Sequence, residues 1–210
     1  MRCLARSTLT ALLNLLVAAV IAPAAWGAQA HNPKATEHFQ QGTRLADHGD
    51  HAGAIKEFEE AVRLEPGWLA LHNDLGVELY LTGNPAAAVR ELRTASDLDP
   101  SQGAVRVNLG FALYDLGKLD EAVTAWREAL DRGATVADAY AGLALGLYKQ
   151  GHADEAFQMY RKAIATDSAY ARVAHLGAEG AGWSPHAVSD AAQLLQALDA
   201  AQSNTPHTAD

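Results

Sequence analysis

The chain of 210 residues contains a single cysteine, Cys3, and only seven prolines. If residues 1–30 are cleaved off, no thiol remains, which excludes disulfide bonds and thiol catalysis in the mature protein. Proline is rare within the long stretches of periodic apolar residues, where alanine is abundant. This composition favours helices over strands.

Basic side chains are also scarce. The sequence holds 16 Lys and Arg against 25 Asp and Glu, a formal net charge of −9 at pH 7. Without Arg2 and Arg6, 14 basic side chains face 25 acidic ones and the formal net charge is −11. Such an excess of negative charge repels phosphate backbones and anionic lipid surfaces, so we do not expect nucleic acid as a partner.

Motifs for catalysis and for cofactor binding are missing as well. No serine lies in a strained nucleophile turn, and the glycines at 177, 180 and 182 follow no predicted strand and precede no Gly-Lys-Ser/Thr ending. Residues 47–51, Asp-His-Gly-Asp-His, gather four possible metal ligands in one turn, but nothing in the sequence supplies further ligands. We predict no enzyme activity, no cofactor and no metal site, and metal binding by His48 and His51 stays open.

Residues 1–30 have the order of a secretory signal peptide. Arg2 and Arg6 precede an apolar run over 9–22, and Ala28-Gln29-Ala30 has the A-x-A form of a cleavage site. A cut after Gly27 is the alternative. The run is shorter than the ~20 residues that a spanning helix needs, so an uncleaved anchor is disfavoured. We expect a periplasmic or secreted protein without membrane insertion after cleavage.

Self-similarity at an interval of 34 residues organises the rest of the chain. Units that begin at residues 35, 69, 103 and 137 align without an insertion. Two columns hold glycine or another small residue, two hold alanine, and one holds a large side chain. These columns are Gly42, Gly76, Gly110 and Ala144; Gly49, Gly83, Gly117 and Gly151; Ala54, Ala88, Ala122 and Ala156; Ala61, Ala95, Ala129 and Ala163; and Phe58, Leu92, Trp126 and Tyr160.

Each column has a physical role in a pair of antiparallel helices. The second glycine column allows positive φ and ends the first helix, and small residues let the two helices approach while the large residue fills the space beside them. Asn84-Pro85 reads as an N-cap followed by proline in the first helical position. The pattern predicts helices at 34–48, 51–64, 68–82, 85–98, 102–116, 119–132, 136–150 and 153–166.

Segments such as Asn108-Leu109-Gly110, Ala112-Leu113-Tyr114 with Gly117, and Glu121-Ala122 resemble the tetratricopeptide repeat family. The resemblance covers Ala35 to about Tyr170. It implies an all-α, right-handed α-solenoid of four helix-turn-helix repeats within 31–170, with units at 35–68, 69–102, 103–136 and 137–170. The family's tryptophan near the start of each unit is replaced by His38, His72, Arg106 and Tyr140.

A solenoid needs its last apolar face covered by an atypical element. Ser184-Pro185 reads as an N-cap and first helical residue, and we predict a capping helix at 185–200. We expect residues 171–184 to form an irregular connection or a decayed half-repeat, and residues 201–210 to form a mobile tail. The apolar stripe of the capping helix comprises Ala187, Val188, Ala191, Leu194, Leu195 and Leu198.

The resemblance also implies that the first helix of each pair lines a concave groove for an extended peptide or a helix. Tyr80, Tyr114 and Tyr148 recur there at 34-residue intervals, either as a binding ladder or as packing between helices. The expected groove residues are Phe39, Thr43, Asn73, Val77, Tyr80, Val107, Asn108, Phe111, Tyr114, Leu145 and Tyr148, with Asp138 beside them.

The partner expected from the resemblance is another protein or peptide. The chaperone adaptors of the family clamp a carboxylate with Lys, Arg and Asn, but only Asn108 matches here and no cation is present, so we reject a clamp. We predict an interaction scaffold or assembly factor of the cell envelope. The alternative is a non-catalytic accessory subunit of an envelope enzyme or polysaccharide-processing complex, which would call for exposed aromatic side chains with flanking carboxamides.

Overall fold

The computed structural model describes residues 31–134, 136–177 and 181–203. The expected signal peptide at 1–30 lies outside the described residues, as does most of the tail expected at 201–210. The described residues from 32 onward form one compact unit. In the described part of the chain, no helix is both long enough and apolar enough to cross a membrane.

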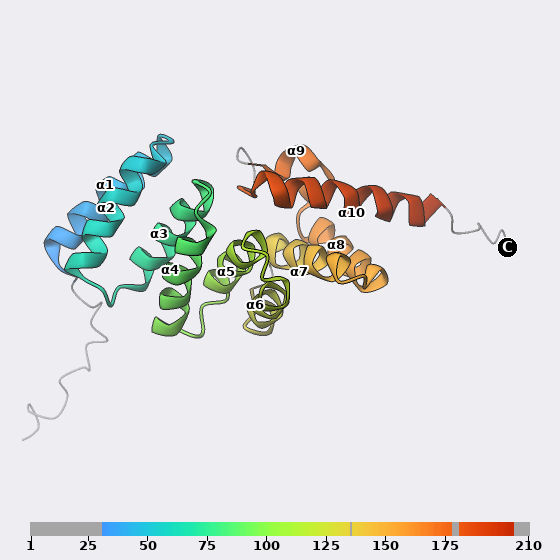
Figure 1. Cartoon of the computed structure of the whole chain (residues 1–210), viewed down its shortest axis with the longest axis horizontal. Coiled ribbons are helices and arrows are strands. Elements are labelled where there is room, and N and C mark those ends of the chain that lie inside the picture. Colours follow the sequence, from blue (N-terminus) through green and yellow to red (C-terminus); the bar gives the residue numbers. More distant parts are fainter. Residues whose placement is uncertain (1–30, 135, 178–180, 204–210) are drawn as a thin grey trace, which may run out of the picture. The chain divides into compact units, whose positions relative to one another are not determined.

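Four antiparallel helix pairs follow one another along this unit (Figure 1). Within each pair the helices pack along their length, and the second helix of a pair contacts the first helix of the next. The chain is therefore an α-solenoid, with no strand among the described residues. The pairs are α1 (Pro33–Asp47) with α2 (His51–Leu64), α3 (Leu69–Leu81) with α4 (Pro85–Leu98), α5 (Gly103–Asp115) with α6 (Leu119–Asp131), and α7 (Ala137–Lys149) with α8 (Ala153–Thr166).

Local signals in the sequence explain where these helices begin and end. The side chains of Asn32, Asp50 and Asn84 accept hydrogen bonds from backbone N–H groups in the first turns of α1, α2 and α4, so each is an N-cap. The four glycines of the turn column have φ between +76° and +84°, a conformation that other residues rarely adopt. Gly133 shares this conformation after α6, although it lies outside the repeated column.

The small and large columns meet inside each pair. A Cβ atom on Gly110 would lie 2.3 Å from Nε1 of Trp126, and one on Gly76 would lie 2.6 Å from Cγ of Leu92. Trp126 and Leu92 are fully buried. The large side chain of the second helix therefore occupies the space that the glycine of the first helix leaves free, as the repeat pattern predicts.

At the position of the family's tryptophan, this chain has side chains that carry polar groups. His72 bonds the Glu91 carboxylate through Nδ1 and the Pro66 carbonyl through Nε2. One repeat later, Arg106 repeats this arrangement with the Glu128 carboxylate and the Pro100 carbonyl. In the first unit His38 pairs with Glu57, and in the fourth the Lys162 ammonium lies over the Tyr140 ring. Hydrogen bonds and charge thus join the two helices of each unit where the family uses apolar packing.

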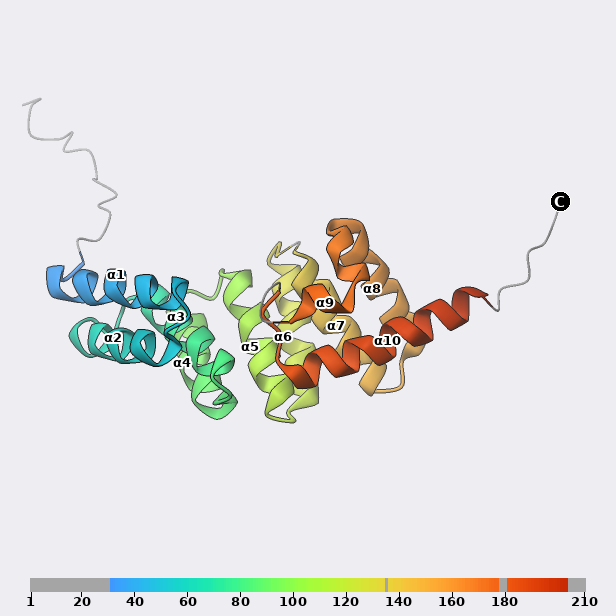
Figure 2. The same ribbon diagram turned by 90° about the horizontal axis from the view of Figure 1, so that it is seen from above.

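After α8 the chain forms the 3-10 helix η1 (Ser168–Ala171), the short helix α9 (Val173–Leu176) and the long helix α10 (Pro185–Ser203). Ser184 caps α10, because its Oγ accepts a hydrogen bond from the N–H of Ala187. Five of the six residues of the apolar stripe of α10 are buried, and Val188 is partly buried. The contacts of α10 are with α9, with α7 and also with α5, so α10 reaches back beyond the last repeat (Figure 2).

Candidate binding groove

The inner helices α3, α5 and α7 carry most of the residues expected to line the groove, but α10 covers part of them. Tyr114 of α5 is only 3% exposed, and its hydroxyl donates to a carboxylate oxygen of Asp190 in α10 at 2.6 Å. The ring of His186, one turn earlier, stacks on Tyr114 at 5.3 Å. Lys149 of α7 completes this polar cluster, with Nζ 2.7 Å from the second oxygen of Asp190. Tyr114 therefore binds the protein's own C-terminal helix.

Two pKa shifts follow from these contacts. Burial, together with the nearby Asp190 carboxylate, raises the pKa of the Tyr114 hydroxyl far above its usual value, so the hydroxyl remains a donor. For Asp190, burial alone would raise the pKa, but the hydrogen bonds from Lys149 and Tyr114 outweigh it and hold the pKa below its usual value. The ionised carboxylate is thus stabilised between α5, α7 and α10.

The beginning of α10 is attached to α3 and α5 by Ser184. Its N–H donates to the Tyr80 hydroxyl oxygen at 2.9 Å, and its Oγ donates to Asp115 at 2.8 Å. Burial and the Asp115 carboxylate raise the pKa of Tyr80 to about 12. The N-cap of α10 therefore also fixes this helix against the solenoid.

Trp183 forms a wall across the groove just before α10. It is 4% exposed, its ring centroid lies 4.8 Å from that of Phe111, and its Nε1 donates to Asp138 at 2.8 Å. Tyr170 donates to the same Asp138 oxygen at 2.5 Å. Trp183 and the stripe of α10 belong to the hydrophobic core, so this wall is built into the packing of the fold.

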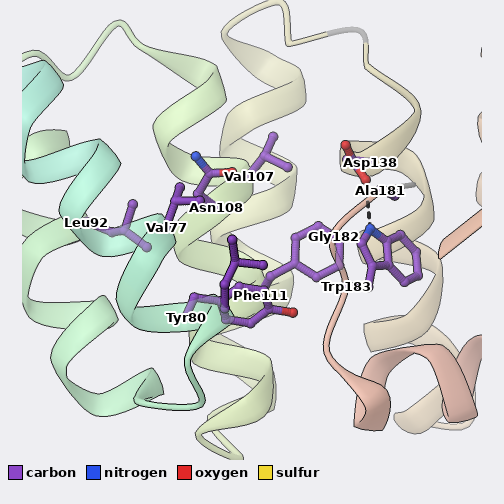
Figure 3. A pocket seen from close by; sticks show the side chains of 11 residues that line it. Val77, Tyr80, Leu92, Val107, Asn108, Phe111, Asp138, Ala181, Gly182 and Trp183 are labelled. Atoms are coloured by element: carbon purple, nitrogen blue, oxygen red, sulfur yellow. Dashed lines mark hydrogen bonds between the residues drawn. The ribbon is translucent and has the colours of Figure 1, made fainter. Parts of the chain in front are cut away.

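An open cavity of about 140 Å³ remains beside that wall (Figure 3). In Figure 3, Tyr80 and Phe111 lie between Val77 and the indole ring of Trp183, and the dashed line joins this ring to Asp138. The lining is mostly apolar, which suits an apolar side chain of a ligand. It comprises Val77, Tyr80, Leu81, Leu92, Val107, Asn108, Phe111, Asp138, Ala181, Gly182 and Trp183.

A second cavity of about 150 Å³ adjoins the first at Val77, which lines both. Its other lining residues are Thr43, Ala46, Phe58, Asp74 and Glu78. The helices that line the first cavity are α3, α4, α5 and α7, and those that line the second are α1, α2 and α3, with Val77 of α3 in both. We call the lining of these two cavities the open groove.

A row of hydrogen-bonded polar side chains joins the linings of the two cavities. Asn108 of α5 donates through Nδ2 to Oδ1 of Asn73 at 3.1 Å, and Asn73 of α3 donates to Asp74 at 3.0 Å. Each carboxamide keeps further donor or acceptor capacity, because an amide offers two N–H groups and two lone pairs. The row can therefore bond both the N–H and the C=O groups of an extended backbone.

The residues expected to line the groove thus fall into two groups. Thr43, Val77, Tyr80, Val107, Asn108 and Phe111 line the open groove, and Asn73 bonds to Asn108. Of the others, Phe39 packs against Phe58 and Trp68, Tyr148 packs near Phe157, and Tyr114 and Leu145 are buried. The tyrosine column therefore does not form a continuous exposed ladder.

Leu81, Asp74 and Trp183 were not among the residues expected from the repeat. Trp183 had a signal in the sequence, because an apolar residue directly before an N-cap often packs against the helix that follows. Asp74 had one too, because it aligns with a position of the carboxylate clamp that the chaperone adaptors use.

The histidines of the first turn have protein partners. His51 Nδ1 lies 2.7 Å from Oε2 of Glu78, and His48 Nδ1 lies 2.6 Å from the carbonyl oxygen of Arg44. Over residues 31–134, 136–177 and 181–203, no group of three or more His, Cys, Asp or Glu side chains is placed to hold a metal ion.

Comparison with known proteins supports the repeat assignment. The family model described as "Tetratricopeptide repeat" matches residues 39–103, 73–134 and 107–171, which together span more than half of the chain. A search of curated protein sequences gives no significant match.

Solved structures with the same fold cover much of the chain. A crystal structure of MamA has a TM-score of 0.61 at 23% identity, over 84% of this chain and 98% of that one. YrrB, described as a TPR protein with an unusual peptide-binding site, has a TM-score of 0.58 at 25% identity, over 64% of this chain and 69% of YrrB. The first TPR of Spaghetti (RPAP3), bound to an HSP90 peptide, has a TM-score of 0.56 at 19% identity, over 60% of this chain and 99% of that one. At 23% and 19% identity, the structures of MamA and of the Spaghetti TPR show the fold alone.

Proposed function

Because the chain belongs to the tetratricopeptide repeat family, we propose that it is a non-catalytic interaction scaffold that binds an extended peptide of a partner protein in the open groove. Two of the similar structures, YrrB and RPAP3, are described as having a peptide-binding site or a bound peptide. We further propose that the protein works in the cell envelope, as an assembly factor or scaffold.

The adjoining cavities beside the carboxamide row carry the proposal of a peptide ligand. An extended chain presents side chains and backbone polar groups along its whole length, whereas a helix satisfies its own backbone groups. The open groove offers apolar space at Phe111 and Val77, and Asn73 and Asn108 add groups that bond a backbone. An extended segment uses both features at once, so it fits better than a helix.

A polysaccharide ligand fits the same surface less well. Sugar rings stack on exposed aromatic faces, but Phe111 and Trp183 are buried, and Tyr80 is half-buried with its hydroxyl already bonded to Ser184. The geometry therefore favours a polypeptide over a carbohydrate.

Replacing Val77 with tryptophan tests the groove directly. Val77 borders both cavities, so a large side chain there fills them without changing the charge. We expect the affinity for a partner captured from the envelope fraction to fall at least about ten-fold, the usual effect of blocking a central contact. The matched control is Leu98→Trp, because Leu98 is an exposed apolar residue at the end of α4 outside the groove. If both variants stay folded and bind like the unchanged protein, the open groove is not the binding surface.

The proposed envelope location rests on the order of charge, apolar run and A-x-A in residues 1–30. Intact-mass measurement on protein from the producing cell should give a chain that starts near His31 or Ala28. A full-length chain retained in the cytoplasmic membrane would contradict export with cleavage.

A further inference from the structure

The open groove contains a carboxylate that has no cationic partner. Asp74 of α3 is partly buried and accepts a hydrogen bond from Asn73. Among the described residues, no Lys, Arg or His forms an ion pair with it. Burial raises the pKa of Asp74 above its usual value, and the Glu78 carboxylate one turn later adds to this. An added cation would relieve both effects.

Other inner-face carboxylates already have stronger partners. Glu78 pairs with His51, Asp138 accepts from Trp183 and Tyr170, and Asp190 pairs with Lys149. Each of these groups joins two elements of the fold. Asp74 differs from them because its donor is the neighbouring residue on the same helix, so its interaction stabilises no contact between elements.

The charges around the open groove have one sign. Its lining includes the carboxylates of Asp74, Glu78 and Asp138, and no Lys or Arg belongs to either cavity. A groove with walls of low dielectric focuses such a potential and attracts ligands of opposite charge. The occupant is therefore expected to be basic at this point.

We propose that the segment bound in the open groove carries a lysine or arginine close to an apolar side chain. This inference rests on the proposed function and names the chemistry of its partner. The apolar side chain enters the cavity between Tyr80, Phe111 and Trp183, and the cation pairs with Asp74 in the adjoining cavity. Because both cavities share Val77, one short extended segment reaches both.

Synthetic peptides test this chemistry without knowledge of the natural partner. The peptides are fluorescein-labelled decapeptides built from Gly and Ser. Each contains one Leu and one variable residue, which is Lys, Gln or Glu and lies one to four positions from the Leu. At the best separation the Lys peptide should bind at least about ten-fold more tightly than the Gln peptide, since hydrogen bonds to charged groups have an effect of this size. The Glu peptide should bind most weakly. Fluorescence anisotropy measures all three affinities.

Variants at the groove assign the preference to one carboxylate. Asp74→Asn should reduce the preference for Lys over Gln to about two-fold or less, because a neutral amide cannot pair with the cation. Asp97→Asn is the matched control, since it removes the same charge from an exposed site on α4 and should leave the preference intact. Thr43→Lys supplies a cation from the wall of the same cavity, so it should also remove the preference.

The outcomes separate this inference from the proposed function. If peptides bind and Val77→Trp blocks them, but Lys and Gln peptides bind alike, the basic partner is wrong and the peptide groove stands. If the preference for Lys survives in both Asp74→Asn and Thr43→Lys, Asp74 is not its source and the inference is overturned. If Val77→Trp affects no peptide, both proposals fail. Circular dichroism on every variant shows that the fold is retained.

Discussion

The first two repeats and the last two share the same 34-residue pattern, yet their inner faces have different surroundings. In α1 the buried residues are Ala35 and Gly42, whereas α5 buries ten of its thirteen residues. One reason is position, because α1 is the terminal helix and packs mainly against α2, whereas α5 lies among α3, α4, α6 and α7. The other is α10, which contacts α5 and α7 and has no counterpart on α1. The repeat alone therefore does not define the binding surface, because the C-terminal segment decides which inner faces stay open.

The three tyrosines of one repeat column illustrate this difference. Tyr80 lies at the edge of α10 and accepts a hydrogen bond from Ser184, and Tyr114 lies under α10 and donates to Asp190. Tyr148 is partly buried near Phe157 of its own repeat pair. Identical positions in the repeat thus have three different environments, and a substitution of Tyr114 acts first on the attachment of α10.

The largest effect is expected from detaching α10. Leu194→Asp places a charge at a fully buried position, and such changes cost about 3–5 kcal/mol of unfolding free energy. Thermal unfolding followed by circular dichroism measures the loss, with Gln193→Asp at a neighbouring exposed position as the control. Hydrogen exchange should accelerate in α5 and α7 more than in α1 and α2. Equal acceleration in all four helices would contradict the division of the solenoid into two regions.

A smaller effect is expected from removing the Tyr114 hydroxyl. Tyr114→Phe leaves the buried Asp190 carboxylate without one of its donors, at a cost of about 1.5–3 kcal/mol. Tyr80→Phe leaves the Ser184 N–H without its acceptor and should cost about 1 kcal/mol. Urea denaturation of both variants gives the two losses of unfolding free energy. A larger loss for Tyr80→Phe than for Tyr114→Phe would contradict this expected order.

The contribution of Asp190 should depend on pH. Its pKa in the folded state is below the usual value of 3.8, so its ionised form stabilises the protein above that value, and the stabilisation is lost as pH falls through the folded pKa. Lys149, Tyr114 and His186 are the polar groups that face it. Asp190→Asn should therefore destabilise the protein by about 1 kcal/mol near pH 7, and the difference should shrink toward pH 3. Urea titrations at both pH values check this, and a difference that grows on acidification would contradict it.

The smallest effect is expected at Tyr148. Its ring is partly buried near Phe157 and it lies outside the hydrogen-bonded cluster of Tyr114, Lys149 and Asp190. Tyr148→Phe should change the unfolding free energy by less than about 0.5 kcal/mol, as do most substitutions away from buried polar networks. A loss of unfolding free energy as large as that of Tyr114→Phe would show that the tyrosines of this repeat column contribute equally to stability, whatever their surroundings.

Much of the solenoid could be predicted because its interactions lie within one repeat. Gly110 and Trp126 are sixteen residues apart, and the turn glycines act on their own backbone, so each feature recurs with the repeat. The groove residues of α3 and the first part of α5 followed from the same periodicity. Leu81 was missed because a repeat column records the type of residue and not the depth of the groove around it. Asp74 aligns with a position of the carboxylate clamp and was left out of the expected groove when that clamp was rejected.

The sequence by itself determined the helix pairs, their turns and the close packing of small against large side chains, because these depend on local conformation and on contacts inside one repeat. Only the tertiary structure decided which part of the inner face is open. Tyr114 and Asp190 are 76 residues apart, and the apolar stripe of α10 has the ordinary helical spacing, which fits an end of the solenoid as well as its groove. The choice between these positions depends on the fit of Trp183, Ser184 and Asp190 to three different helices, and such a fit exists only in the folded chain.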